Sequence, residues 1–458
     1  MTSSWIEEEL CCAQFNDKRL NERFIKIATE LAESPSESIH SASIDWASTK
    51  ASYRFFDNEN VDSKKISKPH FEATRLRCAN YNRIIIAQDT SYINFNKHKK
   101  TKNLGKSFKA HGEEVKGICQ HVGLALSEKG LPLGLVYNKL WNRKDSHQTE
   151  YKRSSLPIQL KESFRWIECM RKAREYLVNE EIVLVSDREG DIYEAFEEAY
   201  DLDVDVVIRC QHDRVLEEEL KISELLSLEK VKGRHRVVIP GNGSRKKRVA
   251  NLALRYRRIE LKSRPNDQRT QQNKGRKDIE LYVLDATEEG GSLSWRIITT
   301  LAIESAEVAK EVLNIYSKRW NVELYFKSLK TGCTVEDCRL GEAGKLIKYI
   351  SLMSVIAWRI FWINFVGRED PEESSEKVLV RNEWKTAWLM LNRNKIKEGK
   401  VKKSEMPDVA PGLREAIHWI AGLGGFLRRK GDGEPGLITF WRGWNKLQNG
   451  LEIYELMA

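Results

Sequence analysis

Short apolar runs and longer amphipathic stretches alternate through the middle of the chain. An apolar run of four to eight residues between turn residues is typical of a buried strand, and apolar residues at every third or fourth position are typical of a helix. Three consecutive strands followed by alternating helices and strands predict a mixed α/β sheet. The predicted strands are 84–89, 117–126, 131–137, 182–186 and 204–209, and the predicted helices between them are 161–178 and 191–200.

Helical patterns precede this predicted sheet. Apolar residues recur at helical spacing from Leu20 to Leu31, and a second helix is predicted over 44–56. Together with the helix that leads up to Arg75, they predict a small helical domain over residues 1–70.

The pattern changes again after the last predicted strand. Residues 210–300 carry short apolar alternations among basic, glycine and asparagine turns, which predicts a mostly β insertion in a central domain over 71–366. That domain ends in an apolar helix over 345–366 and an acidic linker over 367–376. The tail, 377–458, is helical in pattern and rich in tryptophan, which suits either a dimer interface or the core of a small bundle.

Positive charge is concentrated in one segment of the chain. The chain has 458 residues and a net charge of +10, but residues 230–278 alone hold 17 Lys and Arg against three acids, so the rest of the chain is slightly acidic. Such a basic segment attracts a polyphosphate without regard to its sequence. The eight cysteines include no Cys-x-x-Cys pair, and no apolar leader opens the chain, so we expect a cytoplasmic protein with free thiols.

Candidate chemistry is concentrated in a predicted helix from Glu311 to Lys330. At about 100° per residue, one arc of about 80° on this helix collects a carboxylate, a phenol and three cations. These residues are Tyr316, Arg319, Glu323, Lys327 and Lys330. Charge alone favours a solvated face stabilised by ion pairs, because Arg319 and Glu323 are four residues apart.

Two aspartates upstream favour a reactive site instead. Asp89 and Asp187 each close a short apolar run, and a carboxylate at the end of a buried strand lies at the rim of the sheet, where sites form in α/β proteins. With Glu323 they make a set of oxygen ligands suited to Mg²⁺ or Mn²⁺. Two such ions can activate a water or a 3′ hydroxyl and stabilise the leaving oxygen of a phosphodiester.

The spacing of Tyr316, Arg319, Glu323 and Lys330 resembles the Tyr-Arg-Glu-Lys signature of the insertion-sequence-4 group of bacterial DDE transposases. The aspartate segments Gln88–Ser91 and Asp187–Tyr193 are also similar to motifs of that family. The resemblance extends in order over nearly the whole chain. Further matching segments are Ser52–Phe56, Leu423–Phe426 and Trp441–Trp444.

The resemblance implies a ribonuclease-H-like catalytic core in which Asp89, Asp187 and Glu323 bind two Mg²⁺ ions, with Mn²⁺ as a substitute. It implies a cut-and-paste DNA transposase that nicks the transposon end, forms a hairpin and joins the 3′ ends to target DNA. Expected partners are the double-stranded inverted repeats, target DNA and a second copy of the chain in a homodimer bound near the bacterial nucleoid. Residues expected to contact DNA are Tyr316, Arg319, Lys327, Lys330, Trp295, Arg209, Arg54 and Arg23.

Several alternatives stay open at this point. Trp295, which matches the base-stacking tryptophan of the family, would be assigned to the core if judged alone. The basic loop Arg245–Arg248 does not align with the family residue by residue, so its contacts are not assigned. A two-metal nuclease or resolvase that never joins strands, and an inactive DNA-binding relic, are the rival functions.

Overall fold

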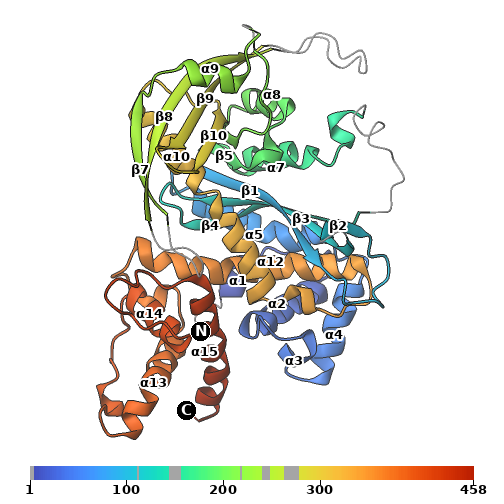
Figure 1. The fold of residues 1–458 in the computed structure, drawn as a ribbon. Coiled ribbons are helices and arrows are strands. Elements are labelled where there is room, and N and C mark those ends of the chain that lie inside the picture. Colours follow the sequence, from blue (N-terminus) through green and yellow to red (C-terminus); the bar gives the residue numbers. More distant parts are fainter. Residues whose placement is uncertain are drawn as a thin grey trace.

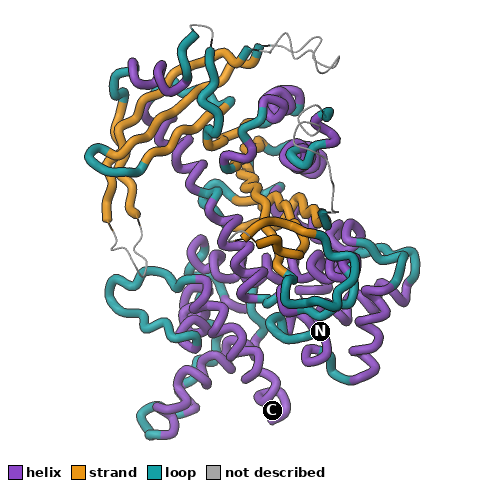
Figure 2. Tube along the Cα trace, turned by 45° about the vertical axis from the view of Figure 1, so that its right-hand side comes forward, coloured by secondary structure: helices purple, strands orange, loops and turns teal. Residues whose placement is uncertain are grey.

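A large sheet forms the middle of the protein, and helices from both ends of the chain gather beneath it in the view of Figure 1. The computed structural model describes residues 5–110, 113–143, 156–216, 219–239, 248–262 and 278–457. Figure 2 shows that the described helices of the two ends lie together on one side of the strands, with both chain ends among them. The prediction of a mixed α/β fold with helical ends is confirmed.

Three of the N-terminal helices have an aspartate as their N-cap. Asp17, Asp45 and Asp62 each accept a backbone N–H from the first turn of the helix that follows, at 2.9, 2.6 and 2.8 Å. Such caps typically contribute about 1 kcal/mol each. The helices are α1 (Trp5–Leu10), α2 (Lys18–Glu33), α3 (Ile39–Ala42), α4 (Trp46–Asp57) and α5 (Ser63–Cys78).

The helical cluster has its own aromatic core. The rings of Phe15, Phe24 and Phe55 are buried, and their centroids lie 5.2 to 5.8 Å apart. Helix α5, however, packs on a strand and on the long helix of the central domain, so it joins the cluster to the rest of the protein.

The described residues of the sheet form ten strands. Their order is β2-β3-β1-β5-β6-β10-β9-β8-β7, with β4 paired to β3. Every predicted strand of the core is present, whereas β2 was not predicted. The strands are β1 (Arg83–Asn94), β2 (Lys106–Ala110), β3 (Glu113–Leu126), β4 (Pro132–Trp141), β5 (Glu181–Ser186), β6 (Asp205–Arg209), β7 (Gly233–Ile239), β8 (Arg248–Leu261), β9 (Ile279–Glu288) and β10 (Ser294–Thr299).

The register of β1 against β5 sets the geometry of the site. These strands pair in parallel up to Ala87 and Val185, so Asp89 and Asp187 each lie two residues past the last pair. Asp89 does not end its strand, contrary to the prediction, because β1 continues to Asn94 by antiparallel pairing with β3. Helices α7 (Phe164–Tyr176) and α8 (Tyr193–Asp201) flank β5 in sequence as predicted.

The β-rich insertion continues the central sheet. Strand β10 pairs with β6, with Ile297 opposite Arg209, and β9, β8 and β7 follow in order beside it. One short helix, α9 (Ile222–Leu228), lies within this part of the described chain. The predicted insertion is therefore β-rich, but the sheet passes into it without a break.

The single helix predicted from Glu311 to Lys330 is wrong. The structure has α10 (Ala306–Ser317), then α11 (Trp320–Lys327), then a π-helical turn, η4 (Ser328–Gly332). Between α10 and α11 the backbone tightens, because the amides of Lys318 and Arg319 bond to carbonyls three residues back at 3.0 Å. The five candidate residues therefore do not share one ideal helical face.

Helix α12 (Ala343–Glu369) is the central support of the fold. It contacts β4 and the N-terminal helices on one part of its length and the C-terminal helices on another. By length and composition it could cross a membrane, but 78% of its most apolar window is buried inside the protein. The predicted linker over 367–376 begins too early, since Gly367 lies in this helix against Ile417.

Three helices form the C-terminal part: α13 (Arg381–Lys397), α14 (Leu413–Leu423) and α15 (Leu437–Met457). Trp384, Trp388, Trp441 and Trp444 are all buried among them and α12. These tryptophans thus build the core of a bundle, one of the two roles left open by the sequence.

A buried ionic cluster ties α1 and α5 to the sheet. The Glu9 carboxylate accepts hydrogen bonds from His70 Nδ1 and, at 2.7 and 2.9 Å, from Arg77. The Leu135 amide donates to His70 Nε2 at 2.9 Å, so the ring is neutral and carries its proton on Nδ1. Burial lowers the pKa of His70 although Glu9 lies beside it.

This cluster predicts a loss of stability in acid. The pKa of an ordinary histidine is about 6.5, so below this pH His70 binds a proton in the unfolded chain but not in the folded protein. The free energy of unfolding therefore falls as the pH falls. His70→Gln cannot titrate, so its melting temperature should fall less steeply than that of the wild type between pH 7 and pH 5. Parallel curves in thermal unfolding would contradict this role of His70.

Candidate active site

Two aspartates meet where the parallel pairing of β1 and β5 ends. Asp89 Oδ1 accepts the amide of Thr90 at 2.7 Å, and Asp187 Oδ1 accepts the amide of Glu189 at 2.9 Å. Asp187 thereby caps the short 3₁₀ helix η2 (Arg188–Gly190). The Asp89 carboxylate is held by the next residue of its strand and the Asp187 carboxylate by the turn after β5, and both keep other oxygen lone pairs for a ligand.

Glu323 joins the aspartates through Arg319. The Arg319 guanidinium donates to Glu323 at 2.6 Å and lies 3.4 Å from a carboxylate oxygen of Asp89. The side chains of Arg319 and Asp89 are 15% and 17% exposed, so this contact is mostly shielded from water. The predicted ion pair of Arg319 with Glu323 exists, but it is shared with an aspartate and is not a solvated surface pair.

The three acids act on one another electrostatically. Burial raises the pKa of Asp89 to about 7, and the charges of Asp187 and then Glu323 add to the rise. The Thr90 amide and Arg319 oppose it without overcoming it. Asp89 thus faces both other acids, and Arg319 supplies one positive charge against three carboxylates.

This residue set fits a divalent ion in its chemistry. Three carboxylates with a single internal cation leave two negative charges uncompensated when all are ionised, and hard oxygen ligands prefer Mg²⁺ or Mn²⁺. Within the described residues, no three acidic, histidine or cysteine side chains already surround a single point. Arg319 lies between two of the three acids, so the carboxylates would close around an ion only when it moves aside.

An aromatic pair lies beside this centre. Tyr316, at the end of α10, is buried, and its ring centroid is 6.5 Å from that of Trp295 on β10. Burial raises the pKa of Tyr316, while Arg319 and Arg209 lie close enough to oppose the rise. Trp295 is only partly buried, and Arg209 donates to the carbonyl of Ser294 at 3.4 Å.

The other predicted contacts lie in different places. Lys327 is exposed at the end of α11, and Lys330 lies in η4, where burial lowers its pKa. Arg23 on α2 and Arg54 on α4 belong to the N-terminal helical cluster, away from the acids. Residues 245–247 of the basic loop lie outside the described residues, and Arg248 is paired with Glu288.

Sequence reasoning missed Arg165, Glu189 and His121, which surround the two aspartates. Glu189 lies in the aspartate segment Asp187–Tyr193, but nothing in the sequence indicated that its carboxylate pairs with Arg165. Arg165 is a buried arginine of α7, and no sequence pattern distinguishes it from the surface arginines of the same helix.

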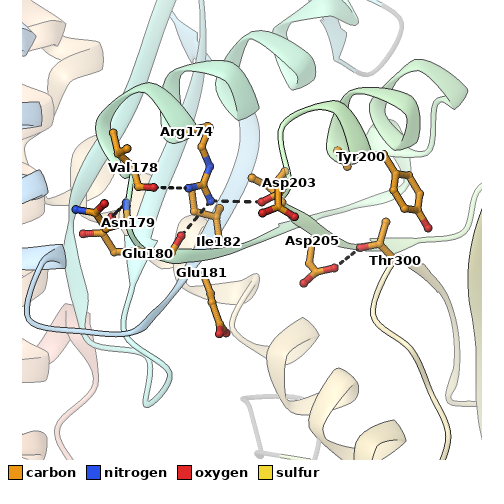
Figure 3. Close-up of a pocket in the computed structure, with 12 residues that line it drawn as sticks. Arg174, Val178, Asn179, Glu180, Glu181, Ile182, Tyr200, Asp203, Asp205 and Thr300 are labelled. Carbon is orange, nitrogen blue, oxygen red and sulfur yellow. Dashed lines mark hydrogen bonds between the residues drawn. The ribbon is translucent and has the colours of Figure 1, made fainter.

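A cavity of about 360 Å³ lies at the opposite end of β5 and β6 (Figure 3). Arg174 closes one side by donating to the carbonyls of Val178 and Glu180 at 3.1 and 3.0 Å. Asp205 on the other side accepts from Thr300 at 2.7 Å. Because Asp205 begins β6, whereas Asp187 follows the end of the adjacent β5, this cavity is separate from the three acids.

Three family models match successive parts of the chain. Residues 2–61 match a family model described as transposase DNA-binding, residues 82–343 match the transposase DDE domain, and residues 355–453 match the transposase Tn5 dimerisation domain. The structure is also similar to a cryo-EM structure of the piggyBac transposase synaptic complex with hairpin DNA. That likeness covers 99% of this chain and 78% of that chain, with a TM-score of 0.41 and 8% identity.

The DDE match alone covers more than half of the chain, and its limits enclose Asp89, Asp187 and Glu323. The resemblance to the insertion-sequence-4 group of DDE transposases is confirmed by the matches, which include a DNA-binding region and a Tn5-type dimerisation region. The chain belongs to the insertion-sequence-4 type of DDE transposases, metal-dependent enzymes that cut DNA and transfer its strands.

Proposed function

We propose that Asp89, Asp187 and Glu323 hold two Mg²⁺ ions, for which Mn²⁺ substitutes. The observation that carries this proposal is that Arg319 bridges Asp89 and Glu323 while Asp187 lies close enough to Asp89 to act on its charge. When bound, the ions supply activation of a water or a 3′ hydroxyl and stabilisation of the leaving oxygen of a phosphodiester. The chain's own carboxylates fix where this chemistry takes place.

The cations and aromatic rings near the acids would hold the transposon end. Tyr316, Lys327 and Lys330 are proposed to contact the end phosphates, and Arg319 joins them once the carboxylates have other counter-charges. Arg209 and Trp295 would lie beside a base flipped out of the duplex, which supports cleavage through a hairpin. The partly buried ring of Trp295 beside Tyr316 supports this role.

The remaining parts would organise the reaction. We assign residues 1–70 to recognition of the inverted repeats, with Arg23 and Arg54 at the DNA, and residues 71–366 to catalysis. Residues 377–458 would hold two copies of the chain together on DNA. The enzyme would act in the cytoplasm, associated with the nucleoid when bound, and join the 3′ ends to target DNA.

The metal site predicts the behaviour of Glu323→Gln. The amide keeps the shape of the side chain but removes a ligand charge, so Mg²⁺-dependent nicking should fall by on the order of 10³-fold, several kcal/mol of activation free energy. Binding of the transposon end in a gel shift should survive. A surface ion pair would instead change stability by less than about 1 kcal/mol and leave nicking alone.

Glu311→Gln is a matched control for this variant. Glu311 on α10 also pairs with an arginine, Arg83, at 2.8 Å, but at the other end of β1. Its substitution should leave nicking unchanged. Robust nicking by Glu323→Gln on a preparation that binds the end would refute the catalytic role of Glu323.

Trp295→Ala is expected to impair the base-flipping step. Without stacking on the extruded base, roughly 1–3 kcal/mol is lost, so hairpin formation should slow by about 5- to 150-fold while nicking continues. Trp320, an exposed tryptophan on α11, provides the control, and Trp320→Ala should form hairpins at the normal rate. A normal rate of hairpin formation in Trp295→Ala would show that Trp295 is a packing residue and does not stack on a flipped base.

The basic loop predicts a salt dependence of DNA affinity. Neutralising Arg245, Lys246 and Lys247 should make the slope of log K against log salt shallower, by about 0.9 for each DNA phosphate that the loop no longer neutralises. Arg248→Gln should change the slope less, because Arg248 is paired with Glu288. An unchanged affinity and slope in the triple variant would show that the loop does not meet DNA.

A further inference from the structure

One buried guanidinium contacts the neighbours of both aspartates. Arg165 on α7 has a side chain only 8% exposed. Its Nε donates to the Thr90 hydroxyl at 2.8 Å, its Nη1 donates to the carbonyl of Glu162 at 2.9 Å, and its Nη2 pairs with the Glu189 carboxylate. Three chain segments far apart in sequence therefore meet at one side chain.

The contacts of Arg165 lead directly to the catalytic carboxylates. Thr90 follows Asp89, and its amide bonds to Asp89 Oδ1. Glu189 lies two residues after Asp187, and its amide bonds to Asp187 Oδ1. Arg165 thus holds the residue whose backbone orients each aspartate, and it reaches both from the same helix.

Hydrogen bonds of the sheet do not link the two aspartates directly. Parallel pairing of β1 with β5 ends at Ala87 and Val185, so no ladder hydrogen bond joins the two strands where the aspartates stand. Without a further link, the separation of the two carboxylates would depend on the pairing of β1 with β3, on the turn after β5 and on the repulsion between the carboxylates. Arg165 links the two segments beyond the Ala87–Val185 pair, because it contacts both Thr90 and Glu189.

The Thr90 hydroxyl has a second partner that fixes its direction. It lies 2.8 Å from Nδ1 of His121, a fully buried ring packed edge-on against Trp166. Burial lowers the pKa of His121 well below its usual value, so the ring is neutral and Nδ1 can accept. The hydroxyl therefore receives from Arg165 and donates to His121, which leaves it no freedom to rotate.

We propose that Arg165 is a positioning residue that fixes the spacing of Asp89 and Asp187 for metal binding. This inference rests on the proposed metal site. The planar fork of arginine serves three acceptors in different directions, which the single ammonium of a lysine cannot reproduce, so Arg165→Lys should fail to restore the function of the site.

The experiment measures metal affinity in the full-length protein without DNA. Mn²⁺ binding to the wild type, Arg165→Met and Arg165→Lys is followed by electron paramagnetic resonance, beside end binding and thermal unfolding. Both variants should bind Mn²⁺ about 10- to 100-fold more weakly, as expected when a group that orients metal ligands is removed. Their nicking should recover in part at high Mg²⁺, and end binding should be unchanged.

Arg171→Met is the matched control. Arg171 lies on the same helix and makes a two-point pair with Glu198 at 2.7 and 2.6 Å, away from the aspartates. This variant should keep the Mn²⁺ affinity of the wild type. A folded Arg165→Met with wild-type Mn²⁺ affinity would overturn the proposal.

Two further variants keep the test decisive. If Arg165→Met does not fold, Glu189→Gln removes one arm of the link at a side chain that is 56% exposed, and it too should weaken Mn²⁺ binding. Asp187→Asn tests the metal site itself. If it keeps wild-type affinity and nicking, the proposed function is wrong, whereas its failure beside a normal Arg165→Met and a normal Glu189→Gln would refute only the role of Arg165.

Discussion

The in-register parallel pairing of β1 with β5 is the constraint on which the rest of the structure depends. It carries Asp89 and Asp187, 98 residues apart in the chain, to equivalent positions two residues past the last pair of these strands. Backbone hydrogen bonds hold that register, and the aliphatic side chains of both strands are buried on both faces of the sheet, where they pack closely. The catalytic geometry is thus a consequence of how the core packs.

Bringing acids together in this way opposes folding, and the protein offsets the cost with positive charge. Asp89 is half-buried near two other carboxylates, and Arg319 compensates them only in part. Negative charge that remains uncompensated in the folded protein favours binding of a cation. Groups with strongly shifted pKa values are often found at functional sites for this reason. The apolar support comes from elsewhere, chiefly α12 beneath the sheet, so stability and chemistry reside in different parts of the molecule.

Much of this fold could be predicted because its signals are local. The apolar runs before Asp89 and Asp187 predicted the strands, and helical spacing from Leu20 to Leu31 predicted α2. Most of what could not be predicted depends on tertiary structure. The passage of β1 beyond Asp89 and the burial of Arg165 both come from partners distant in sequence. The tightened turn at Lys318 and Arg319 is local, since their amides bond to carbonyls three residues back, but no glycine or proline marks it in the sequence. The motif residues of the site were found through the family resemblance, whereas the side chains that hold them in place carry no signature.

The central claim, that three carboxylates form the metal centre, is tested most directly by anomalous diffraction. Crystals of the full-length protein with a transposon end, grown in Mn²⁺, would show where the ions bind. The account predicts anomalous peaks within bonding distance of Asp89, Asp187 and Glu323, with Arg319 withdrawn from the two carboxylates that it bridges. Ions bound elsewhere, or none at these carboxylates while the DNA end is in place, would contradict it.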